Sequence, residues 1–301
     1  MNADSIRTLA VIGAGQMGSG IAEVAASRGI VARLTDATLE RAQASKAATL
    51  KRLDRLVEKG KVSVELRAKT AEHIQPASFE AAVSAADFVI EAATEAPDVK
   101  RELFRRMDAA APAHAVLASN TSSISITRLA AETRRPDRVI GMHFFNPVPL
   151  MKLVELVRGL PTSTETLEET SALATRLDKT IIVSEDSPGF LINRMLIPFI
   201  NEACFAAQER VGSIEHIDQG ARLGLNHPMG PLELADFIGL DTLLSISDVL
   251  QRELGDDKYR PATILRNLVA AGWLGKKAGR GFYEYDESGQ KLGPSRLGGI
   301  A

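Results

Sequence analysis

The sequence predicts an α/β protein with an N-terminal, doubly wound sheet and an all-helical C-terminal domain. Three observations support this fold class. Short apolar segments alternate with helical segments through the first part of the chain, which favours a mostly parallel sheet covered on both faces. A glycine-rich turn joins the first strand to the first helix. After residue 185 the strand pattern stops and longer helical segments follow.

The bulk composition limits the classes of function. The 301 residues suffice for two domains, and 45% hydrophobic and 25% charged residues are ordinary for a globular protein. A formal net charge of −2 gives no reason to expect nucleic acid or an anionic membrane as a partner. No apolar run is long enough to span a membrane, and the opening residues lack a signal-peptide pattern. The single cysteine excludes an intrachain disulfide and a cysteine zinc cluster, and no two histidines have the i, i+4 helical spacing of a zinc site. We therefore expect a cytoplasmic protein without a metal site.

The first strand and helix frame a dinucleotide-binding signature. The strand Thr8 to Ile12 leads into Gly13-Ala14-Gly15-Gln16-Met17-Gly18, and a helix follows from Ser19 to Arg28. The first glycine permits a tight turn, the second lets the backbone approach a pyrophosphate, and the third allows close helix–strand packing. The helix N-terminus offers N–H groups to the phosphates. We therefore expect a Rossmann-type domain, with cofactor contacts from Gly13, Gly15, Gln16, Met17 and Gly18.

The second strand, Ile30 to Leu34, ends close to an acid, Asp36. This is about the position at which an acid meets the adenosine ribose of the cofactor. A carboxylate there accepts hydrogen bonds from the ribose hydroxyls and repels a 2′-phosphate, so we expect NAD rather than NADP. The alternative is a glycine turn in some other doubly wound fold.

Residues 37–71 are expected to form one long amphipathic helix. One face carries a run of cations that includes Arg52 and Lys59. Such a run is usually a solvated surface. The alternative is a patch that attracts a polyphosphate substrate such as coenzyme A.

The alternation of strands and helices continues to residue 185. Strands are expected at residues 88–92, 115–118, 138–144, 152–157 and 180–183, and helices at residues 99–108, 124–132 and 168–177. Polar side chains follow two of these strands: Glu95 comes after the strand that ends at Ala92, and Ser119 to Ser123 follow the next. Ligands of open α/β sheets bind at this end of the strands. The serine cluster can cap a helix or supply hydroxyls to a substrate.

Residues 141–156, GMHFFNPVPLMKLVEL, place a histidine and an acid in two neighbouring strands. The turn that begins at Asn146 can fold the strands together and bring Glu155 to His143. In such a pair the acid fixes the imidazole tautomer, while the other ring nitrogen takes a proton from a substrate. Beside a nicotinamide site, such a base indicates alcohol oxidation. The alternative is a core histidine and an unrelated surface acid.

The polar segment Ser184 to Gly189 is the predicted domain boundary, with domains at residues 1–185 and 186–301. Helices are expected at residues 190–209, 214–223, 232–238, 241–254 and 263–271, followed by a basic, glycine-rich loop with a short extended piece up to Tyr285. The last dozen residues are expected to be frayed. A small domain with apolar helix faces often pairs with a copy of itself, so we expect a homodimer.

Four sequence blocks together resemble the 3-hydroxyacyl-CoA dehydrogenase family, especially its 3-hydroxybutyryl-CoA branch. They are the Gly13 fingerprint, SNTSS at residues 119–123, HFFNPVPLMKLVE at residues 143–155 and DSPGFLINR at residues 186–194. The resemblance extends from about Thr8 to Tyr285. It implies reversible, NAD-dependent oxidation of (S)-3-hydroxyacyl-CoA to 3-oxoacyl-CoA in fatty acid metabolism, and a helical C-terminal domain that dimerises.

The resemblance also implies roles for single residues. His143 is similar to the family's catalytic base and Glu155 to its orienting partner, while Ser122 and Asn193 resemble the residues that hold the reacting oxygens of the substrate. Lys59 resembles a coenzyme A contact, and Arg52 stands where the family has a serine, so the details of coenzyme A binding differ. Contacts with NAD are implied for Ala92, Glu95, Lys100, Ser122, Asn146 and Lys277, and a contact with the acyl-CoA substrate for Ser122.

Two other functions are compatible with the same residues. A related NAD-dependent dehydrogenase of a free hydroxy acid or sugar acid would need no basic helix. A dinucleotide-binding sensor would keep the fold and lose the chemistry, although the His143–Glu155 pair argues against it.

Overall fold

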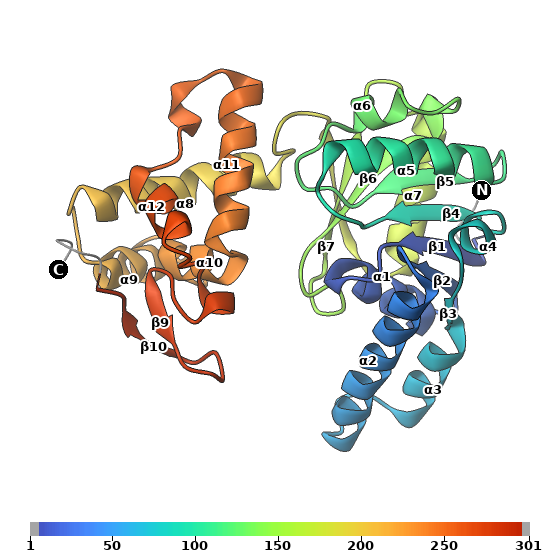
Figure 1. Ribbon diagram of the computed structural model, residues 1–301, viewed down its shortest axis with the longest axis horizontal. Helices are drawn as coiled ribbons and strands as arrows, with labels where there is room; N and C mark the ends of the chain where they lie inside the picture. The colour runs from blue at the N-terminus through green and yellow to red at the C-terminus, as the bar shows by residue number, and fades with distance from the viewer. Residues whose placement is uncertain (1–5, 297–301) are drawn as a thin grey trace. The chain divides into compact units, whose positions relative to one another are not determined.

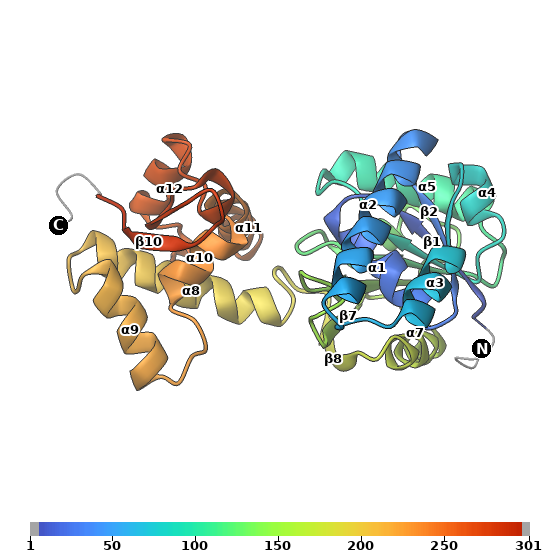
Figure 2. The same cartoon turned by 90° about the horizontal axis from the view of Figure 1, so that it is seen from below.

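The computed structural model describes residues 6–296. The chain divides into two compact units, with the division between Ser187 and Pro188. Figures 1 and 2 show the elements of each unit, and each unit is described by itself below.

An eight-stranded sheet in the order β3-β2-β1-β4-β5-β6-β7-β8 forms the centre of the N-terminal unit. All neighbouring strands are parallel except β6 and β7, which confirms the predicted, mostly parallel sheet. The strand order reverses between β1 and β4, where doubly wound sheets bind their ligands. The strands are β1 (Thr8–Ile12), β2 (Val31–Thr35), β3 (Ile74–Pro76), β4 (Phe88–Glu91), β5 (Val116–Ser119), β6 (Val139–Phe144), β7 (Leu153–Arg158) and β8 (Thr180–Glu185).

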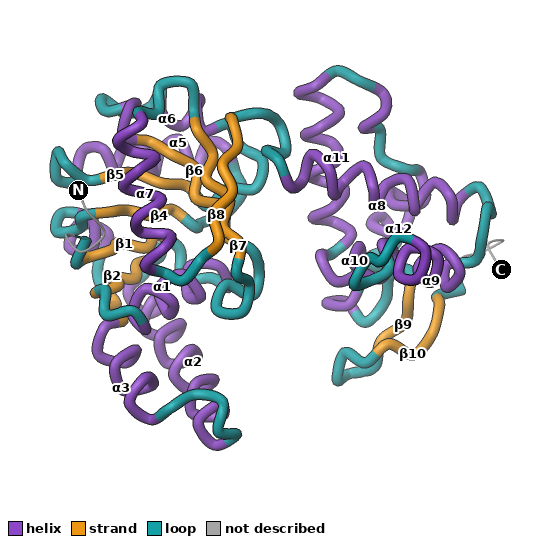
Figure 3. The backbone as a smooth tube through the Cα atoms, turned by 180° about the vertical axis from the view of Figure 1, so that it is seen from behind, coloured by secondary structure: helices purple, strands orange, loops and turns teal. Residues whose placement is uncertain are grey.

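Helices cover both faces of this sheet. One face carries α4 (Phe79–Val83), α5 (Pro97–Ala110) and α6 (Ile126–Ala130), and the other carries α1 (Gln16–Ser27) and α7 (Thr164–Arg176). Figure 1 is drawn with α5 in front of the sheet, and Figure 3, seen from behind, with α7 in front. Both faces of the strands are therefore covered, which explains why every residue of β4, β5 and β6 is buried and why their apolar residues do not alternate with polar ones.

The segment expected as one helix over residues 37–71 is two helices, α2 (Leu39–Glu58) and α3 (Val64–His73). Gly60 adopts a left-handed φ of 64°, which ends α2, and Ser63 caps α3 by accepting a hydrogen bond from the N–H of Leu66. The two helices lie side by side (Figure 1), and Arg67 of α3 pairs with Asp54 of α2 at 2.7 Å. The short elements β3 and α4 were not predicted, because three to five residues carry little periodicity.

The C-terminal unit consists mainly of five helices: α8 (Ile192–Gln208), α9 (Ile214–Gly224), α10 (Pro231–Ile238), α11 (Leu240–Leu254) and α12 (Thr263–Ala270). They enclose a separate apolar core that contains Cys204. An antiparallel hairpin, β9 (Tyr283–Tyr285) and β10 (Lys291–Pro294), follows these helices. Its first strand coincides with the short extended piece expected up to Tyr285, whereas β10 corrects the expectation that the last dozen residues are frayed. Asp286 stabilises the hairpin turn by accepting from the N–H groups of Ser288 and Gln290; residues 297–301 lie outside the described part.

Within residues 6–296, no helix is both long enough and apolar enough to cross a membrane.

Candidate active site

His143 and Glu155 face each other across the antiparallel pair β6 and β7. The strand register places the two residues opposite one another, and His143 Nδ1 lies 3.1 Å from Glu155 Oε2. Both side chains are buried, and the ring of Phe145 packs at 4.6 Å from the imidazole. The turn that starts with the cis Asn146–Pro147 peptide thus joins two strands whose side chains form the expected pair. Because Nδ1 faces the carboxylate, Nε2 is the ring nitrogen on the opposite side.

The turn between β6 and β7 is attached to the rest of the unit at two points. Lys179 donates hydrogen bonds to the backbone carbonyls of Val148 and Met151, at 2.6 and 2.8 Å. Val148 packs against α1 at Gly20, where a Cβ would lie 2.9 Å from the Cβ of Val148. The turn, with the exposed Asn146, is therefore packed on the helix of the dinucleotide signature. Neither Lys179 nor Gly20 was predicted from the sequence, although the run Gly18-Ser19-Gly20 was an available signal for Gly20.

The glycine-rich loop has the geometry that a dinucleotide needs. Gly13 has a φ of 104°, and a Cβ there would lie 2.5 Å from the carbonyl oxygen of Ala92; a Cβ on Gly18 would lie 1.8 Å from that of Gly13. These two glycines are required by packing. A Cβ on Gly15 would meet nothing within 4 Å, so packing does not require this glycine, whereas the close approach of a pyrophosphate to the backbone does. Gln16 and Met17 begin α1, whose first turn contains no acid that would repel a phosphate.

Asp36 lies just beyond β2, at the edge of the same loop. Its Oδ2 accepts from the N–H of Ala14 at 2.7 Å, and its Oδ1 accepts from the N–H of Ala37 at 2.8 Å. Arg41, in the first turn of α2, places Nε 2.9 Å from Oδ1. The carboxylate is thus held in a defined position beside the loop. Its contact with Arg41, one of the cations of the predicted basic helix, was not predicted.

A second charged cluster lies at the carboxyl ends of β4 and β5. Lys100, 1% exposed, donates to both carboxylate oxygens of the fully buried Glu91 at 2.7 and 2.8 Å. Its Nζ also lies 3.2 Å from Glu95 Oε2. Glu91 accepts in addition from the hydroxyl of Ser119 at 2.6 Å. Glu91 was missed, although an acid inside the apolar strand FVIE was a visible signal.

Glu95 connects this cluster to Ser122. Its Oε1 accepts from the hydroxyl of Thr121 at 2.6 Å, and from the N–H and hydroxyl of Ser122 at 2.6 and 3.0 Å. Desolvation raises the pKa of Glu95, but the charge of Lys100 and the hydrogen bonds from Thr121 and Ser122 outweigh it, so the pKa lies below its ordinary value. Lys100 is enclosed by carboxylates, whereas the Glu95 side chain is 40% exposed and is the member of the cluster that a ligand can reach.

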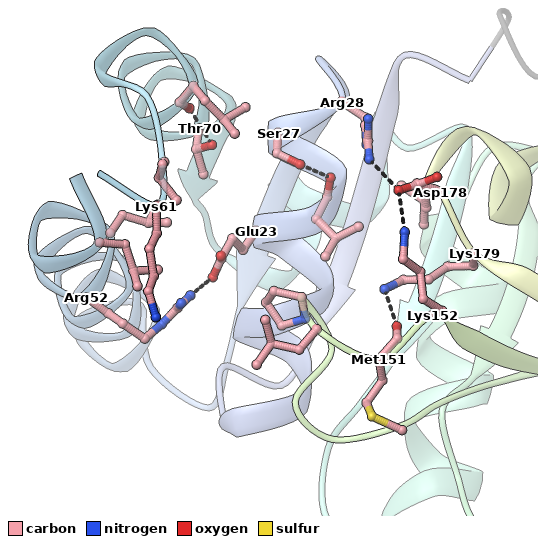
Figure 4. A pocket seen from close by; sticks show the side chains of 18 residues that line it. Glu23, Ser27, Arg28, Arg52, Lys61, Thr70, Met151, Lys152, Asp178 and Lys179 are labelled. Atoms are coloured by element: carbon pink, nitrogen blue, oxygen red, sulfur yellow. Dashed lines mark hydrogen bonds and ion pairs between the residues drawn. The ribbon is translucent and has the colours of Figure 1, made fainter. Parts of the chain in front are cut away.

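A pocket of about 300 Å³ lies among α1, α2, α3 and the turns before β7 and β8 (Figure 4). Leu53, Leu56 and Leu66 contribute apolar surface. Arg52 lines the pocket and pairs with Glu23 of α1. Lys59, the C-cap of α2, is not among its lining residues. The cations that line it are Arg28, Arg52, Lys61, Lys152 and Lys179.

Two of the predicted site residues belong to the C-terminal unit. Asn193 is buried in the first turn of α8, just after Gly189 and Phe190, which both have positive φ. Lys277 pairs with both oxygens of Asp241 at 2.6 and 2.7 Å. The contacts with substrate and NAD that the resemblance implied for them stay predictions.

The comparisons with known proteins agree with this architecture. The family model described as 3-hydroxyacyl-CoA dehydrogenase, NAD binding domain, matches residues 8–187, and the model of the C-terminal domain matches residues 189–285. The chain therefore belongs to the 3-hydroxyacyl-CoA dehydrogenase family, and its N-terminal unit contains the NAD-binding domain. Family membership, fold class and cofactor, all predicted from the sequence, are confirmed.

Individual relatives match over nearly their whole length. A probable 3-hydroxybutyryl-CoA dehydrogenase of Bacillus subtilis is 52% identical over 294 residues, which cover 94% of this chain and 98% of the relative. A 3-hydroxybutyryl-CoA dehydrogenase of Bradyrhizobium diazoefficiens is 50% identical, over 97% of this chain and 99% of the relative. The solved structure of (S)-3-hydroxybutyryl-CoA dehydrogenase from Ralstonia eutropha matches with a TM-score of 0.90 at 48% identity. The match covers 94% of this chain and 100% of the Ralstonia chain.

Proposed function

We propose that this chain catalyses the reversible, NAD-dependent oxidation of short-chain (S)-3-hydroxyacyl-CoA, with 3-hydroxybutyryl-CoA as the main substrate, to 3-oxoacyl-CoA. The buried His143–Glu155 pair carries the proposal. It lies near the carboxyl end of β6, at the same end of the parallel strands as the glycine loop of the NAD-binding domain. The relatives named 3-hydroxybutyryl-CoA dehydrogenase support the substrate.

In the oxidative direction, His143 removes the proton of the 3-hydroxyl group through Nε2. Glu155 keeps the proton on Nδ1 and stabilises the imidazolium that forms. NAD, when bound, accepts the hydride that leaves C3. Ser122 and Asn193 hold the reacting oxygen toward the imidazole, and Glu95 fixes the backbone and hydroxyl of Ser122 for that purpose.

The N-terminal unit contains groups that suit each part of NAD. The loop from Gly13 to Gly18, with the first turn of α1, suits the pyrophosphate, since Gly15 leaves open space. Asp36 suits the adenosine ribose. Nearer the nicotinamide we place residues of the strand ends and turns, Ala92 with its backbone, Glu95, Ser122 and Asn146, with Lys277 from the C-terminal unit. Lys100 acts there by holding Glu95.

The pocket between α1 and α2 suits the anionic end of coenzyme A. Its leucines offer apolar surface to the adenine ring, and Arg52 and Lys61 offer positive charge to the phosphates. Lys59 lies near the end of the same helix and adds to the positive potential. This assignment would make the basic helix more than a solvated surface.

We further propose a cytoplasmic homodimer that acts in fatty acid metabolism. Residues 1–185 would bind NAD, and residues 186–301 would complete the substrate site and dimerise. Exposed apolar side chains in the C-terminal unit support the dimer: Met195, Val211, Leu223 and Leu225. A single, buried cysteine supports a reducing compartment.

Oxidation of NADH with acetoacetyl-CoA as substrate tests the function directly, with free acetoacetate and NADPH as controls. We expect turnover with the thioester and NADH, and far less in either control. Turnover with free acetoacetate would instead support a dehydrogenase of free hydroxy acids. NADH binding without turnover on any thioester would support the sensor.

A further inference from the structure

Arg41 is a cation at the adenosine end of the proposed cofactor site, and no function has yet been assigned to it. It lies in the first turn of α2, behind the N-cap Thr38, and its Nε is 2.9 Å from Asp36 Oδ1. The Arg41 side chain is 68% exposed, whereas that of Asp36 is 12% exposed. The guanidinium is therefore oriented by the carboxylate but remains accessible to a ligand.

The two charges of this pair have opposite effects on a ribose that carries a 2′-phosphate. A carboxylate accepts hydrogen bonds from a 2′-hydroxyl and repels a phosphate, while an arginine near the same position binds the phosphate. Asp36 is held by the backbone N–H groups of Ala14 and Ala37 as well, so three contacts fix the position of its carboxylate. In the native chain the fixed carboxylate therefore dominates, and Arg41 is neutralised.

We propose that Arg41 is a specificity-determining residue that forms, with Asp36, the discrimination between a 2′-hydroxyl and a 2′-phosphate. Paired with Asp36, it orients the carboxylate toward the ribose hydroxyls. Without that carboxylate, the same guanidinium binds the 2′-phosphomonoester of NADP. This inference rests on the proposed use of NAD at the loop from Gly13 to Gly18.

The remaining charges around this turn make Arg41 necessary for such a switch. Glu40 is an exposed acid in the same turn of α2, so removal of both Asp36 and Arg41 leaves a net negative side-chain charge. With Asp36 alone removed, Arg41 offsets Glu40, and the N–H groups at the start of this 20-residue helix add a positive dipole end. The two variants thus differ in the sign of the potential that a 2′-phosphate meets.

The test is a fluorescence titration of NADH and NADPH on the full-length protein and four variants. Asp36→Asn removes the charge and keeps an acceptor for the N–H of Ala14. We expect it to bind NADPH about 10-fold to 100-fold more tightly than the native protein does, and we expect Asp36→Asn/Arg41→Ala to lose that gain. Arg41→Ala alone should weaken NADH binding a few-fold, without any gain for NADPH. Asp36→Asn/Arg55→Ala is the matched control, since Arg55 lies in the last turn of the same helix, and it should keep the gain.

Equal NADPH affinity of the Asp36→Asn and Asp36→Asn/Arg41→Ala variants would overturn the inference, as would the absence of any gain in Asp36→Asn. A native protein that binds no NADH would instead contradict the proposed function. If thermal unfolding shows that Asp36→Asn is not folded, Asp36→Ser takes its place with the same expectations. The gain should also shrink as salt is raised from 0.05 to 0.5 M, as an exposed charge contact requires.

Discussion

Buried carboxylates in the N-terminal unit face cations and an imidazole, whereas those in the helical unit face backbone N–H groups and tyrosine hydroxyls. Glu91 meets Lys100, and Glu155 meets His143. Asp236 accepts from the N–H groups of Phe282 and Tyr283 and from the hydroxyl of Tyr285, at 2.8 to 3.1 Å. Asp218 likewise accepts from the first turn of α10 and from the hydroxyl of Tyr283.

This difference distinguishes carboxylates that can take part in catalysis or ligand binding from carboxylates that stabilise the fold. A carboxylate paired with an imidazole or a lysine can orient a proton or a charge for a ligand. Asp218 and Asp236 instead hold α10 and the β9 hairpin together, and no cation offsets their charge among the partners just named. Burial accordingly raises the pKa of Asp236 to about 6 in spite of its hydrogen bonds, while the pKa of Glu95, beside Lys100, is lowered.

The largest expected effect is on turnover when the imidazole is removed. His143→Gln should lower kcat for acetoacetyl-CoA reduction by about 100-fold to 10,000-fold, because general acid–base catalysis is lost. NADH affinity, measured by fluorescence titration, should stay within a few-fold of the native value.

His114→Gln is the matched control. His114 is half-exposed, lies before β5 and is 3.6 Å from Asp87, which precedes β4. It therefore lies at the amino ends of the parallel strands, whereas His143 lies near the carboxyl end of β6. The kcat of the His114→Gln variant should match that of the native protein. A His143→Gln variant with near-native turnover would contradict a catalytic role for the His143–Glu155 pair.

The second effect is on the stability of the N-terminal unit. Lys100→Met leaves the fully buried Glu91 without its cation, so the free energy of unfolding should fall by about 3 to 5 kcal/mol. Urea unfolding followed by far-UV circular dichroism would measure the loss. Fluorescence of Trp273, the single tryptophan, reports on the helical unit and should change little.

Two further variants sharpen this result. The exposed Arg101, which pairs with Asp98, offers the control Arg101→Met, with little expected change. Glu91→Gln/Lys100→Met should recover part of the loss, because it removes the unpaired charge. A stable Lys100→Met variant with native NADH binding would contradict the importance of this buried pair.

The third effect is on the pH dependence of the helical unit. The folded-state pKa of Asp236, about 6, exceeds its ordinary value of 3.8, so the folded state binds the proton more tightly. The Asp236 contribution to the free energy of unfolding should therefore grow as pH falls from about 6 to about 4, by up to about 3 kcal/mol. Glu95 acts in the opposite sense: its stabilisation is present above pH 4.5 and is lost below it.

Urea unfolding followed by Trp273 fluorescence at several pH values measures this dependence. Asp236→Asn should be less stable than the native protein near pH 4, because its amide presents a donor to the N–H groups of β9, and its pH slope should be flatter. If the native and Asp236→Asn proteins have the same slope, Asp236 does not titrate in this range.

The smallest effect is expected for an exposed pair in the helical unit. Arg266 pairs with Asp248 on the surface, with about half of each side chain exposed, so Arg266→Ala should cost less than about 1 kcal/mol. Trp273 fluorescence in urea again provides the measurement. A loss above about 2 kcal/mol would show that burial is not what distinguishes the strong charge contacts of this chain.

Local signals in the sequence were sufficient for the elements that carry strong periodicity or motifs. The strands β1, β4 and β6, the helix α8 and the glycine loop were predicted close to their observed positions, since each contains or adjoins an apolar run that polar, glycine or proline residues delimit. The approach of Glu155 to His143 was also predictable, because a short turn between two strands brings them together. The division of residues 37–71 into α2 and α3 was missed, although Gly60 and Ser63 are a visible stop and start.

The sequence by itself determined the family, the doubly wound domain and the residues of the His143–Glu155 pair, because these depend on contiguous motifs. Only the tertiary structure decided which groups these charged side chains contact: Lys100 contacts Glu91 and Glu95, Arg41 contacts Asp36, and Asp236 accepts from the N–H groups of Phe282 and Tyr283. Spacing along the chain does not encode such contacts, since they arise where packing brings separate elements to one sheet edge or one helix end. The desolvation that accompanies this packing then sets which of these charged groups depart from their ordinary pKa.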